Sequence, residues 1–191
     1  MPENTAFTLP SDLPRPVDDG ATNHLAGLHI PEILLRSTKG RLVDLSKLTA
    51  LRNVIYCYPM TGVPGNALPE GWDLIPGARG CTPQTCGFRD RCQELAQLQT
   101  EVFGLSTQTT EYQREMAERL HLPFEVLSDS EFKLCAALRL PTFEVKGMRL
   151  LKRLTLIIRA GHIEHVLYPV FPPNESAERA LDWLRNHPIA E

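Results

Sequence analysis

Residues 80–90 read GCTPQTCGFRD, and this stretch lies where a loop rich in glycine and proline meets an amphipathic segment. Two of its residues, Cys81 and Cys86, stand five positions apart. Thr82 and Pro83 predict a helix start, because threonine suits the N-cap and proline the first helical position. Apolar residues then recur at helical spacing to about Gln99. The first turn of a helix presents unpaired N–H groups and partial positive charge, which bias a thiol toward thiolate, so the stretch predicts a redox site.

The segments around this helix predict an α/β fold, because short β-branched or aromatic runs alternate with amphipathic runs. Strands are expected at residues 53–58, 102–106, 123–127, 154–159 and 162–168. Further helices are expected at residues 109–120, after a start at 128–131, and at 176–186. An additional hairpin is expected within residues 30–45. The order resembles a thioredoxin-like fold, with a mixed central β-sheet flanked by helices and an amino-terminal β-hairpin extension.

The chain of 191 residues divides into a short arm and one domain. Residues 1–23 contain four prolines and few large apolar residues, which predicts a flexible amino-terminal arm. Residues 24–191 then form a single domain of ordinary size. A net charge of -3 disfavours nucleic acid as a partner. The sequence shows neither a secretory signal nor an apolar run of membrane-spanning length, so a cytoplasmic protein without membrane contacts is expected.

The chain has five cysteines, which is an odd number, and in a reducing compartment they are not expected to form a framework of structural disulfides. A reactive thiol, a metal site and simple burial remain open. Burial suits Cys57, Cys135 and Cys92, which lies on the apolar face of the expected helix. The spacings among Cys81, Cys86 and Cys92 match no common zinc pattern, and the Cys-x-x-Cys of a disulfide reductase is absent.

Cys81 and Cys86 cannot be joined within one regular helix. Positions five apart are separated by about 140° of rotation and about 7.5 Å of rise, whereas a disulfide needs Cα atoms about 4.4–6.8 Å apart. Either the pair is never joined, or the first turn unwinds, which Gly80 and Gly87 would facilitate. A thiolate that attacks a peroxide also needs a cation for the leaving oxygen, and it becomes a sulfenic acid that Cys86 could resolve.

The stretch GCTPQTCGFRD closely resembles the active-site segment of peroxiredoxins of the bacterioferritin comigratory protein and peroxiredoxin Q subfamily. The YCYP, VFGLST, LPFEVLSDSEFKLC and KRLTLIIRAGHIEHV segments follow in the order of that family. The resemblance implies that Cys81 is the peroxidatic cysteine, that Cys86 is the resolving one, and that Arg153 polarises the peroxide. Arg153 could instead be a solvated charge at a strand start. Cys135 is a minor alternative for the resolving role.

The resemblance also implies the substrates and partners. Hydrogen peroxide and organic hydroperoxides are the expected substrates, and a thioredoxin- or glutaredoxin-like protein is the expected reductant of the disulfide. No metal, flavin or haem is implied, and the protein is expected to be a monomer or a homodimer. The alternative is a non-enzymatic peroxide sensor that uses the same Cys81–Cys86 disulfide and stalls after one oxidation.

One departure from the family lies just before Cys81. Peroxiredoxins carry Pro-x-x-x-Thr-x-x-Cys there, but Leu74 and Ala78 occupy the two positions in this chain. Pro59 and Thr61 match the proline and threonine instead, with residues 62–80 as an insertion. We expect this loop to leave and return, so that Thr61 reaches the peroxide pocket, while Thr82 could substitute or neither hydroxyl could serve. Gln84 could form a hydrogen bond with Arg153 or with the backbone, and a solvated glutamine is an equal alternative.

Overall fold

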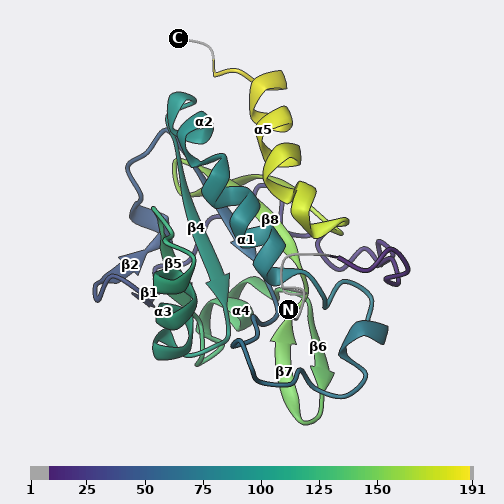
Figure 1. The fold of residues 1–191 in the computed structure, drawn as a ribbon. Helices are drawn as coiled ribbons and strands as arrows, with labels where there is room; N and C mark the ends of the chain where they lie inside the picture. Colours follow the sequence, from purple (N-terminus) through teal and green to yellow (C-terminus); the bar gives the residue numbers. More distant parts are fainter. Residues whose placement is uncertain (1–8, 190–191) are drawn as a thin grey trace.

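A seven-stranded mixed sheet forms the centre of the computed structural model, which describes residues 9–189 (Figure 1). The strand order is β2-β1-β5-β4-β3-β8-β9. The three central strands run parallel, and the outer strands on both sides are antiparallel to their neighbours. The strands are β1 (Leu34–Ser37), β2 (Leu42–Asp44), β3 (Arg52–Cys57), β4 (Thr100–Ser106), β5 (Glu125–Ser128), β8 (Leu154–Arg159) and β9 (His162–Leu167). The predicted mixed α/β architecture is confirmed.

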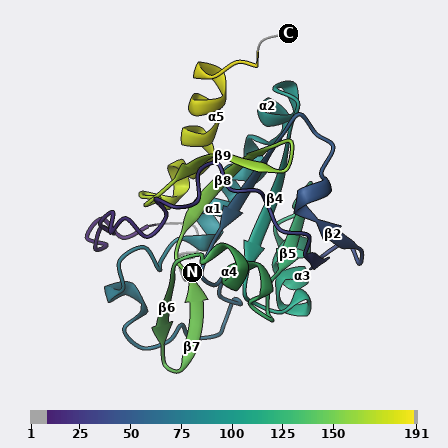
Figure 2. The ribbon, with the colours of Figure 1, turned by 180° about the vertical axis from the view of Figure 1, so that it is seen from behind.

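The helices cover the two faces of the sheet unequally. One face is covered by α1 (Cys81–Asp90), α2 (Cys92–Gln97), α3 (Thr110–Arg119) and α5 (Ser176–Asn186) (Figure 1). The opposite face is covered by α4 (Lys133–Leu138) and by the chain around Leu25 and Ile30 (Figure 2). The sheet therefore separates two apolar cores.

The side chains of β3 alternate between these two cores. Val54 and Tyr56 point to the core under α1, while Ile55 and Cys57 point to the core under α4. Every residue of β3 is buried, as expected for a central parallel strand with helices on both faces. Tyr56 stacks on Phe88 of α1 with ring centroids 4.5 Å apart, so α1 is held against the middle of the sheet.

The helix that carries the two cysteines differs from the prediction at both ends. It begins at Cys81, with Gly80 as the N-cap at φ 100° and without a side-chain cap, so the prediction of Thr82 as the cap is wrong. A Cβ atom on Gly80 would collide with Pro173 and lie 2.9 Å from Leu9, which explains the glycine. The single helix expected to reach Gln99 is also interrupted, because the backbone of Arg91 leaves helical geometry between α1 and α2.

Two of the other helices compare differently with their predicted starts. Thr109 caps α3 as predicted, whereas α4 begins at Lys133, after the predicted start at residues 128–131, and its N-cap residue Phe132 has no side-chain cap. The hydroxyl of Thr109 accepts a hydrogen bond from the backbone N–H of Tyr112, so Thr109 caps α3. Asp129 accepts hydrogen bonds from the N–H groups of Leu134 and Cys135 at the start of α4. Burial raises the pKa of the Asp129 carboxyl in spite of these donors.

The loop expected to be structureless between Pro59 and Gly80 has a small core of its own. It contains a 3-10 helix, η2 (Trp72–Leu74), and Trp72 packs with Ala78, Val145 and Leu150. The latter two belong to a hairpin that the sequence analysis missed, formed by β6 (Thr142–Val145) and β7 (Met148–Leu151). This hairpin projects below the main sheet in Figure 1. Its strands have only four residues each, too few to show a clear alternating pattern.

Both amino-terminal elements contact the domain. The predicted hairpin forms the edge of the main sheet, where β1 pairs with β5 and Arg41 forms an ion pair with Glu125. In the arm expected at residues 1–23, residues 1–8 lie outside the described residues. Asp19 lies 2.6 Å from Lys152 and accepts a 2.8 Å hydrogen bond from Tyr168. The flexibility of the arm stays a prediction, but its described part contacts the domain at defined points.

None of the helices within residues 9–189 is long and apolar enough to cross a membrane.

Candidate active site

Cys81 is the first residue of α1 and is almost fully buried, with 3% of its surface exposed. The first helical hydrogen bond joins the N–H of Gln84 to the carbonyl of Gly80. The N–H groups of Cys81 and Thr82 precede it and have no carbonyl within the helix to bind. Their partial positive charge stabilises an anion at this end of the helix. The sulfur lies 3.7 Å from the carbonyl oxygen of Ala78.

Arg153 precedes β8 and reaches the same sulfur. Its Nη2 atom lies 3.2 Å from Cys81 Sγ, and the side chain is buried with the residue 3% exposed. The guanidinium also donates hydrogen bonds to the carbonyls of Gly77, Ala78 and Arg79, at 3.2–3.3 Å. Because a planar guanidinium fixed in this way cannot turn to solvent, the alternative of a solvated charge is wrong.

A chain of polar side chains fixes the other edge of the guanidinium. Gln84 Oε1 accepts a hydrogen bond from Arg153 Nη1, which confirms one of the two contacts expected for this glutamine. Gln84 Nε2 in turn lies 3.2 Å from the hydroxyl of Ser176, and that hydroxyl lies 3.3 Å from the hydroxyl of Thr155. All three side chains are fully buried, with no exposed surface. The arginine is therefore positioned by α1, α5 and β8 together.

Sequence reasoning missed Ser176 and Thr155. A signal existed for Thr155, because it stands two residues after Arg153 and side chains two apart on a strand share a face. No comparable signal existed for Ser176, which reaches Gln84 only because the start of α5 packs beside α1. Its contribution depends on tertiary structure.

Cys86 lies one turn further along α1, in the core between helix and sheet. It is 8% exposed, and burial raises the pKa of its thiol. Both cysteines are free and lie in the same helix, whereas the predicted start at Thr82 and Pro83 would have left Cys81 just ahead of it. Helix geometry keeps their side chains on different sides of α1, so a bond between them needs the first turn to open.

The remaining cysteines lie away from this pair. Cys57 and Cys135 belong to the core under α4, on the opposite face of the sheet, and both are buried as predicted. Cys92 is half-buried at the start of α2 and packs against the core under α1, so its predicted burial on the apolar face is only partial. Burial raises the pKa of all three thiols. Among residues 9–189, no group of three or more histidine, cysteine or acidic residues could hold a metal ion.

Pro59 and Thr61 follow the end of β3, and their hydrogen bonds lead away from Cys81. The Pro59 carbonyl accepts a bond from Ser106 at 3.0 Å. The N–H of Thr61 donates to Gln108 at 3.0 Å, and the Thr61 carbonyl accepts from the Tyr112 hydroxyl at 2.8 Å. Within the described part of the chain, no hydrogen bond joins Thr61 to Cys81 or Arg153.

The thiol of Cys81 is buried at a helix start, beside the fixed guanidinium of Arg153, and the helix packs on a mixed sheet. Together, this site and this sheet topology define the class of the protein, a thioredoxin-fold enzyme of thiol redox chemistry. The Redoxin family model matches residues 25–181 of the chain. "Peroxiredoxin Bcp" of Escherichia coli K12 is 30% identical over 166 residues, which cover 85% of this chain and 96% of that protein. The chloroplastic "Peroxiredoxin Q" of Sedum lineare is 27% identical over 156 residues, which cover 82% and 75% of the two chains.

Solved structures show the same fold. The peroxidoxin BcpB of Mycobacterium tuberculosis superimposes with a TM-score of 0.69 at 25% identity, covering 85% of this chain and 98% of that one. Peroxiredoxin Q of Xanthomonas campestris, 17% identical, superimposes with a TM-score of 0.66 and covers 94% and 100% of the two chains. The chain belongs to the Redoxin family, in its Bcp and peroxiredoxin Q group of peroxiredoxins. It is accordingly a peroxidase, an oxidoreductase that acts on peroxide.

Proposed function

We propose that Cys81 is the peroxidatic cysteine and that hydrogen peroxide and organic hydroperoxides are its substrates. The Cys81 thiolate attacks the terminal peroxide oxygen, the O–O bond breaks, and the remaining oxygen leaves as water or an alcohol after it takes a proton. Arg153 stabilises the thiolate and the developing charge on the leaving oxygen. The observation that carries this proposal is the 3.2 Å contact between the buried guanidinium and Cys81 Sγ. A structural relative from Xanthomonas campestris is described by its alkyl peroxide reduction activity.

Cys86 resolves the sulfenic acid in this proposal. Its thiol displaces water from the oxidised Cys81 sulfur to form an intramolecular disulfide, after the first turn of α1 has opened. Cys135 is a poor candidate for this role, because it lies on the opposite face of the sheet. A thioredoxin- or glutaredoxin-like dithiol then reduces the disulfide. The protein would work in the reducing cytoplasm, as a monomer or homodimer, with residues 24–191 as its single domain.

For a hydroxyl in the peroxide pocket, the geometry favours Thr82 over Thr61. Thr82 follows Cys81 directly and is nearly buried. Thr61 is bound to Gln108 through its backbone and, at 3.4 Å, through its hydroxyl. Pro59 then contributes only by ending β3 where the loop departs.

Mass spectrometry of the peroxide-treated full-length protein tests the cycle. We expect a single crosslink between Cys81 and Cys86, and sulfenic or sulfinic acid at Cys81 in a Cys86→Ser variant. A crosslink to another cysteine would overturn the role of Cys86, and an unmodified Cys81 would overturn the whole cycle. Continued peroxide consumption with a thioredoxin reductant separates an enzyme from a sensor, since a sensor would stop after one equivalent.

A further inference from the structure

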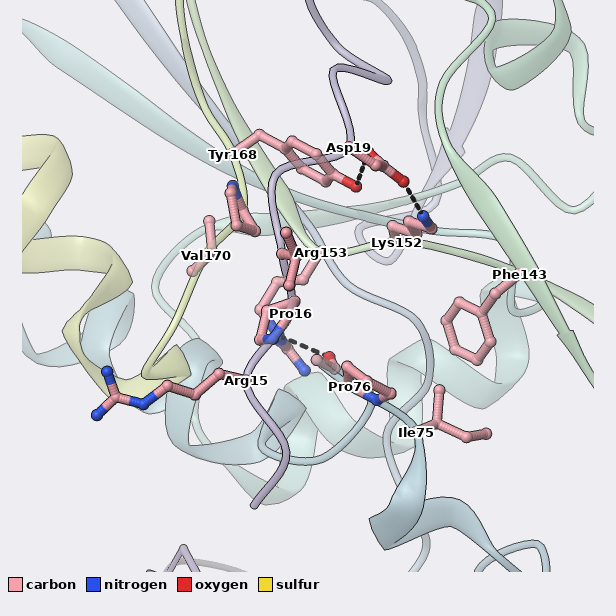
Figure 3. A pocket seen from close by; sticks show the side chains of 13 residues that line it. Arg15, Pro16, Asp19, Ile75, Pro76, Phe143, Lys152, Arg153, Tyr168 and Val170 are labelled. Carbon is pink, nitrogen blue, oxygen red and sulfur yellow. Dashed lines mark hydrogen bonds and ion pairs between the residues drawn. The ribbon is translucent and has the colours of Figure 1, made fainter. Parts of the chain in front are cut away.

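The amino-terminal arm crosses the loop that leads into α1. Arm residues between Arg15 and Asp19 lie between the loop at residues 75–77 and the Tyr168–Val170 segment (Figure 3). These three stretches line a pocket of about 390 Å³ beside Arg153. The arm precedes residue 25, where the match to the Redoxin family begins, so its contacts are additional to the part of the chain that the family match covers.

Two arm residues pack on the short segment that directly precedes α1. Leu9 lies against Gly80, where an added Cβ would be 2.9 Å from the leucine side chain. Pro16 lies beside Gly77, where an added Cβ would be 3.5 Å from the proline ring. The carbonyl of Gly77 also accepts a hydrogen bond from Arg153. The arm therefore packs on both ends of the segment that binds the guanidinium and leads into the helix.

Asp19 fastens the arm to the domain. Its two carboxylate oxygens have different partners, Lys152 Nζ at 2.6 Å and the Tyr168 hydroxyl at 2.8 Å (Figure 3). These hydrogen bonds lower the pKa of Asp19 to about 2, so the carboxylate is charged at neutral pH. The guanidinium of Arg15 lies 5.5 Å from the centre of the Phe171 ring, within reach of a cation–π contact. The arm is therefore held at several points along its described length.

The segment under the arm has to move before the two cysteines of α1 can join. Within the folded helix they are separated by about 7.5 Å along the axis, so the first turn must open. Opening displaces Cys81 together with Gly80, which is the N-cap residue of α1. Contacts that exist only while this turn is folded lower the population of the open state. The packing of Leu9 on Gly80 is such a contact, so the fastened arm opposes opening.

Two reactions compete for the sulfenic acid of Cys81. In the first, the Cys86 thiol loses its proton, the S–S bond forms, the S–O bond breaks and the oxygen leaves as water. In the second, another peroxide molecule transfers one oxygen atom to the sulfur, its O–O bond breaks, and the remainder leaves as water or an alcohol, so that sulfinic acid is formed. Only the first reaction needs the open turn.

We propose that the arm, fastened by Asp19, keeps the first turn of α1 closed and thereby sets the share of Cys81 that is overoxidised to sulfinic acid. Asp19 is a positioning residue, because it acts through the arm and touches neither the sulfur nor the peroxide. The inference rests on the proposed function, since it needs Cys86 as the resolving thiol. A loosened arm should favour the disulfide, and a tightly held arm should favour sulfinic acid.

A single turnover of the full-length protein with hydrogen peroxide, without reductant, tests this proposal. Each molecule passes through the sulfenic acid once and ends as the Cys81–Cys86 disulfide or as sulfinic acid, so intact-protein mass spectrometry gives the ratio of the two products. This ratio does not depend on how fast the sulfenic acid forms. Asp19→Asn should raise the ratio of disulfide to sulfinic acid about threefold or more, because it removes a charge-assisted contact. Tyr168→Phe, which removes one hydroxyl, should raise it about twofold.

Two control variants separate the arm from the stability of the whole domain. Glu32→Gln removes an exposed ion pair with Lys47 and should leave the product ratio unchanged. Val43→Ala weakens the core under α4, so it should lower the Tm and still leave the ratio unchanged. An equal rise of the ratio in Val43→Ala and Asp19→Asn would overturn the inference. An unchanged ratio in both Asp19→Asn and Tyr168→Phe would overturn it as well.

The wild-type protein in the same experiment distinguishes this inference from the proposed function. If it forms the Cys81–Cys86 disulfide and the arm variants give its product ratio, only the role of the arm is wrong. If it oxidises Cys81 but forms no disulfide with Cys86, the resolving role falls and the inference falls with it. If Cys81 is not oxidised at all, the whole cycle is overturned.

Discussion

Each face of the central sheet carries two buried cysteines, and on one face the side chain of Arg153 contacts a cysteine sulfur. Cys81 and Cys86 lie under α1, while Cys57 and Cys135 lie under α4. Cys81 is as inaccessible as Cys135, with 3% and 1% of their surfaces exposed. The difference is the group beside the sulfur, since Arg153 Nη2 lies 3.2 Å from Cys81 Sγ, whereas Cys135 Sγ lies 3.7 Å from the carbonyl oxygen of Leu140. Burial by itself therefore says nothing about whether a thiol is reactive.

The alternation of two strands decides which face receives the arginine. Cys57 pairs with Leu154 in the antiparallel β3–β8 ladder, and Arg153 stands one residue before it. Side chains of adjacent strand residues point to opposite faces, so Arg153, Thr155 and Ile157 share the α1 face. A register shift of one residue would bring the guanidinium to the face of Cys57.

The largest expected effect separates the two faces directly. Cys81→Ser should lower peroxide turnover by about a thousandfold or more, because it removes the sulfur that we propose as the attacking group. Cys57→Ala and Cys135→Ala should keep most of the turnover and lower the free energy of unfolding by about 1 kcal/mol, through lost packing. Peroxide consumption and chemical denaturation of the same preparations measure both effects. Loss of turnover in Cys135→Ala with Cys81→Ser still active would reverse the assignment.

The next effect concerns the donor that distinguishes the faces. Arg153→Gln should lower kcat/KM by about 10²–10³, the usual cost of one preorganised donor to a developing charge. Arg153→Lys should restore only part of the kcat/KM that Arg153→Gln loses, because one ammonium group cannot bind the sulfur, Gln84 and three carbonyls together. The second-order rate of Cys81 oxidation, followed by stopped-flow fluorescence, is the measurement. Equal rates for Lys and Arg would show that charge alone suffices.

The pH dependence of disulfide formation tests the buried state of Cys86. Its raised pKa keeps the folded thiol protonated, and opening of the first turn returns the pKa to about 8.5. The rate of disulfide formation should therefore increase up to about tenfold per pH unit below pH 8.5, and it should become constant above that pH. Quenched-flow mass spectrometry measures this rate.

The same group links pH to stability. The buried Cys86 thiol contributes to the free energy of unfolding. This contribution is fully present below the pKa of about 8.5 that the thiol has in the unfolded chain, and it is lost as the pH rises toward the higher pKa of the folded state. Thermal unfolding at increasing pH should show this decline, and Cys86→Ser should reduce it. An identical decline in that variant would attribute the effect to other groups, such as Cys57, Cys92 and Cys135, whose pKa values burial also raises.

The smallest effect compares two hydroxyls. Thr82→Val should lower kcat/KM about tenfold or less, as expected for one hydrogen bond to the reacting peroxide. Thr61→Val should change it less than about twofold, since its backbone contacts with Gln108 and Tyr112 are retained. A larger effect at Thr61 would show that the loop brings this hydroxyl to the peroxide after all.

Local patterns predicted most of the fold and part of the site. The apolar run of β3, the Thr109 cap and the 11 residues of α5 are readable because each depends on neighbouring residues. The start of α1 was misplaced because proline and threonine cues point to residue 82, whereas Gly80 is selected by its contact with Pro173, far away in sequence. Ser176 was missed for the same reason, whereas the β6–β7 hairpin was missed because its four-residue strands show no clear alternation.

The contacts of the amino-terminal arm with the domain were also beyond local reasoning. Prolines and aspartates in residues 10–19 have the composition of a flexible segment, and only Lys152 and Tyr168 show where Asp19 binds. Arg153 was found through a family resemblance, since a single arginine before a strand has no distinguishing pattern of its own.

The ends of the described chain differ in their suitability for tagging and immobilisation. Leu9 lies against Gly80, the residue before Cys81. At the other end, the carbonyl of His187 binds Arg52 at the start of β3, about 20 Å along a six-residue strand from the edge where Cys81 lies. A fusion partner or surface linker attached at the carboxyl terminus should leave the chemistry undisturbed, whereas one attached ahead of Leu9 would crowd the helix start.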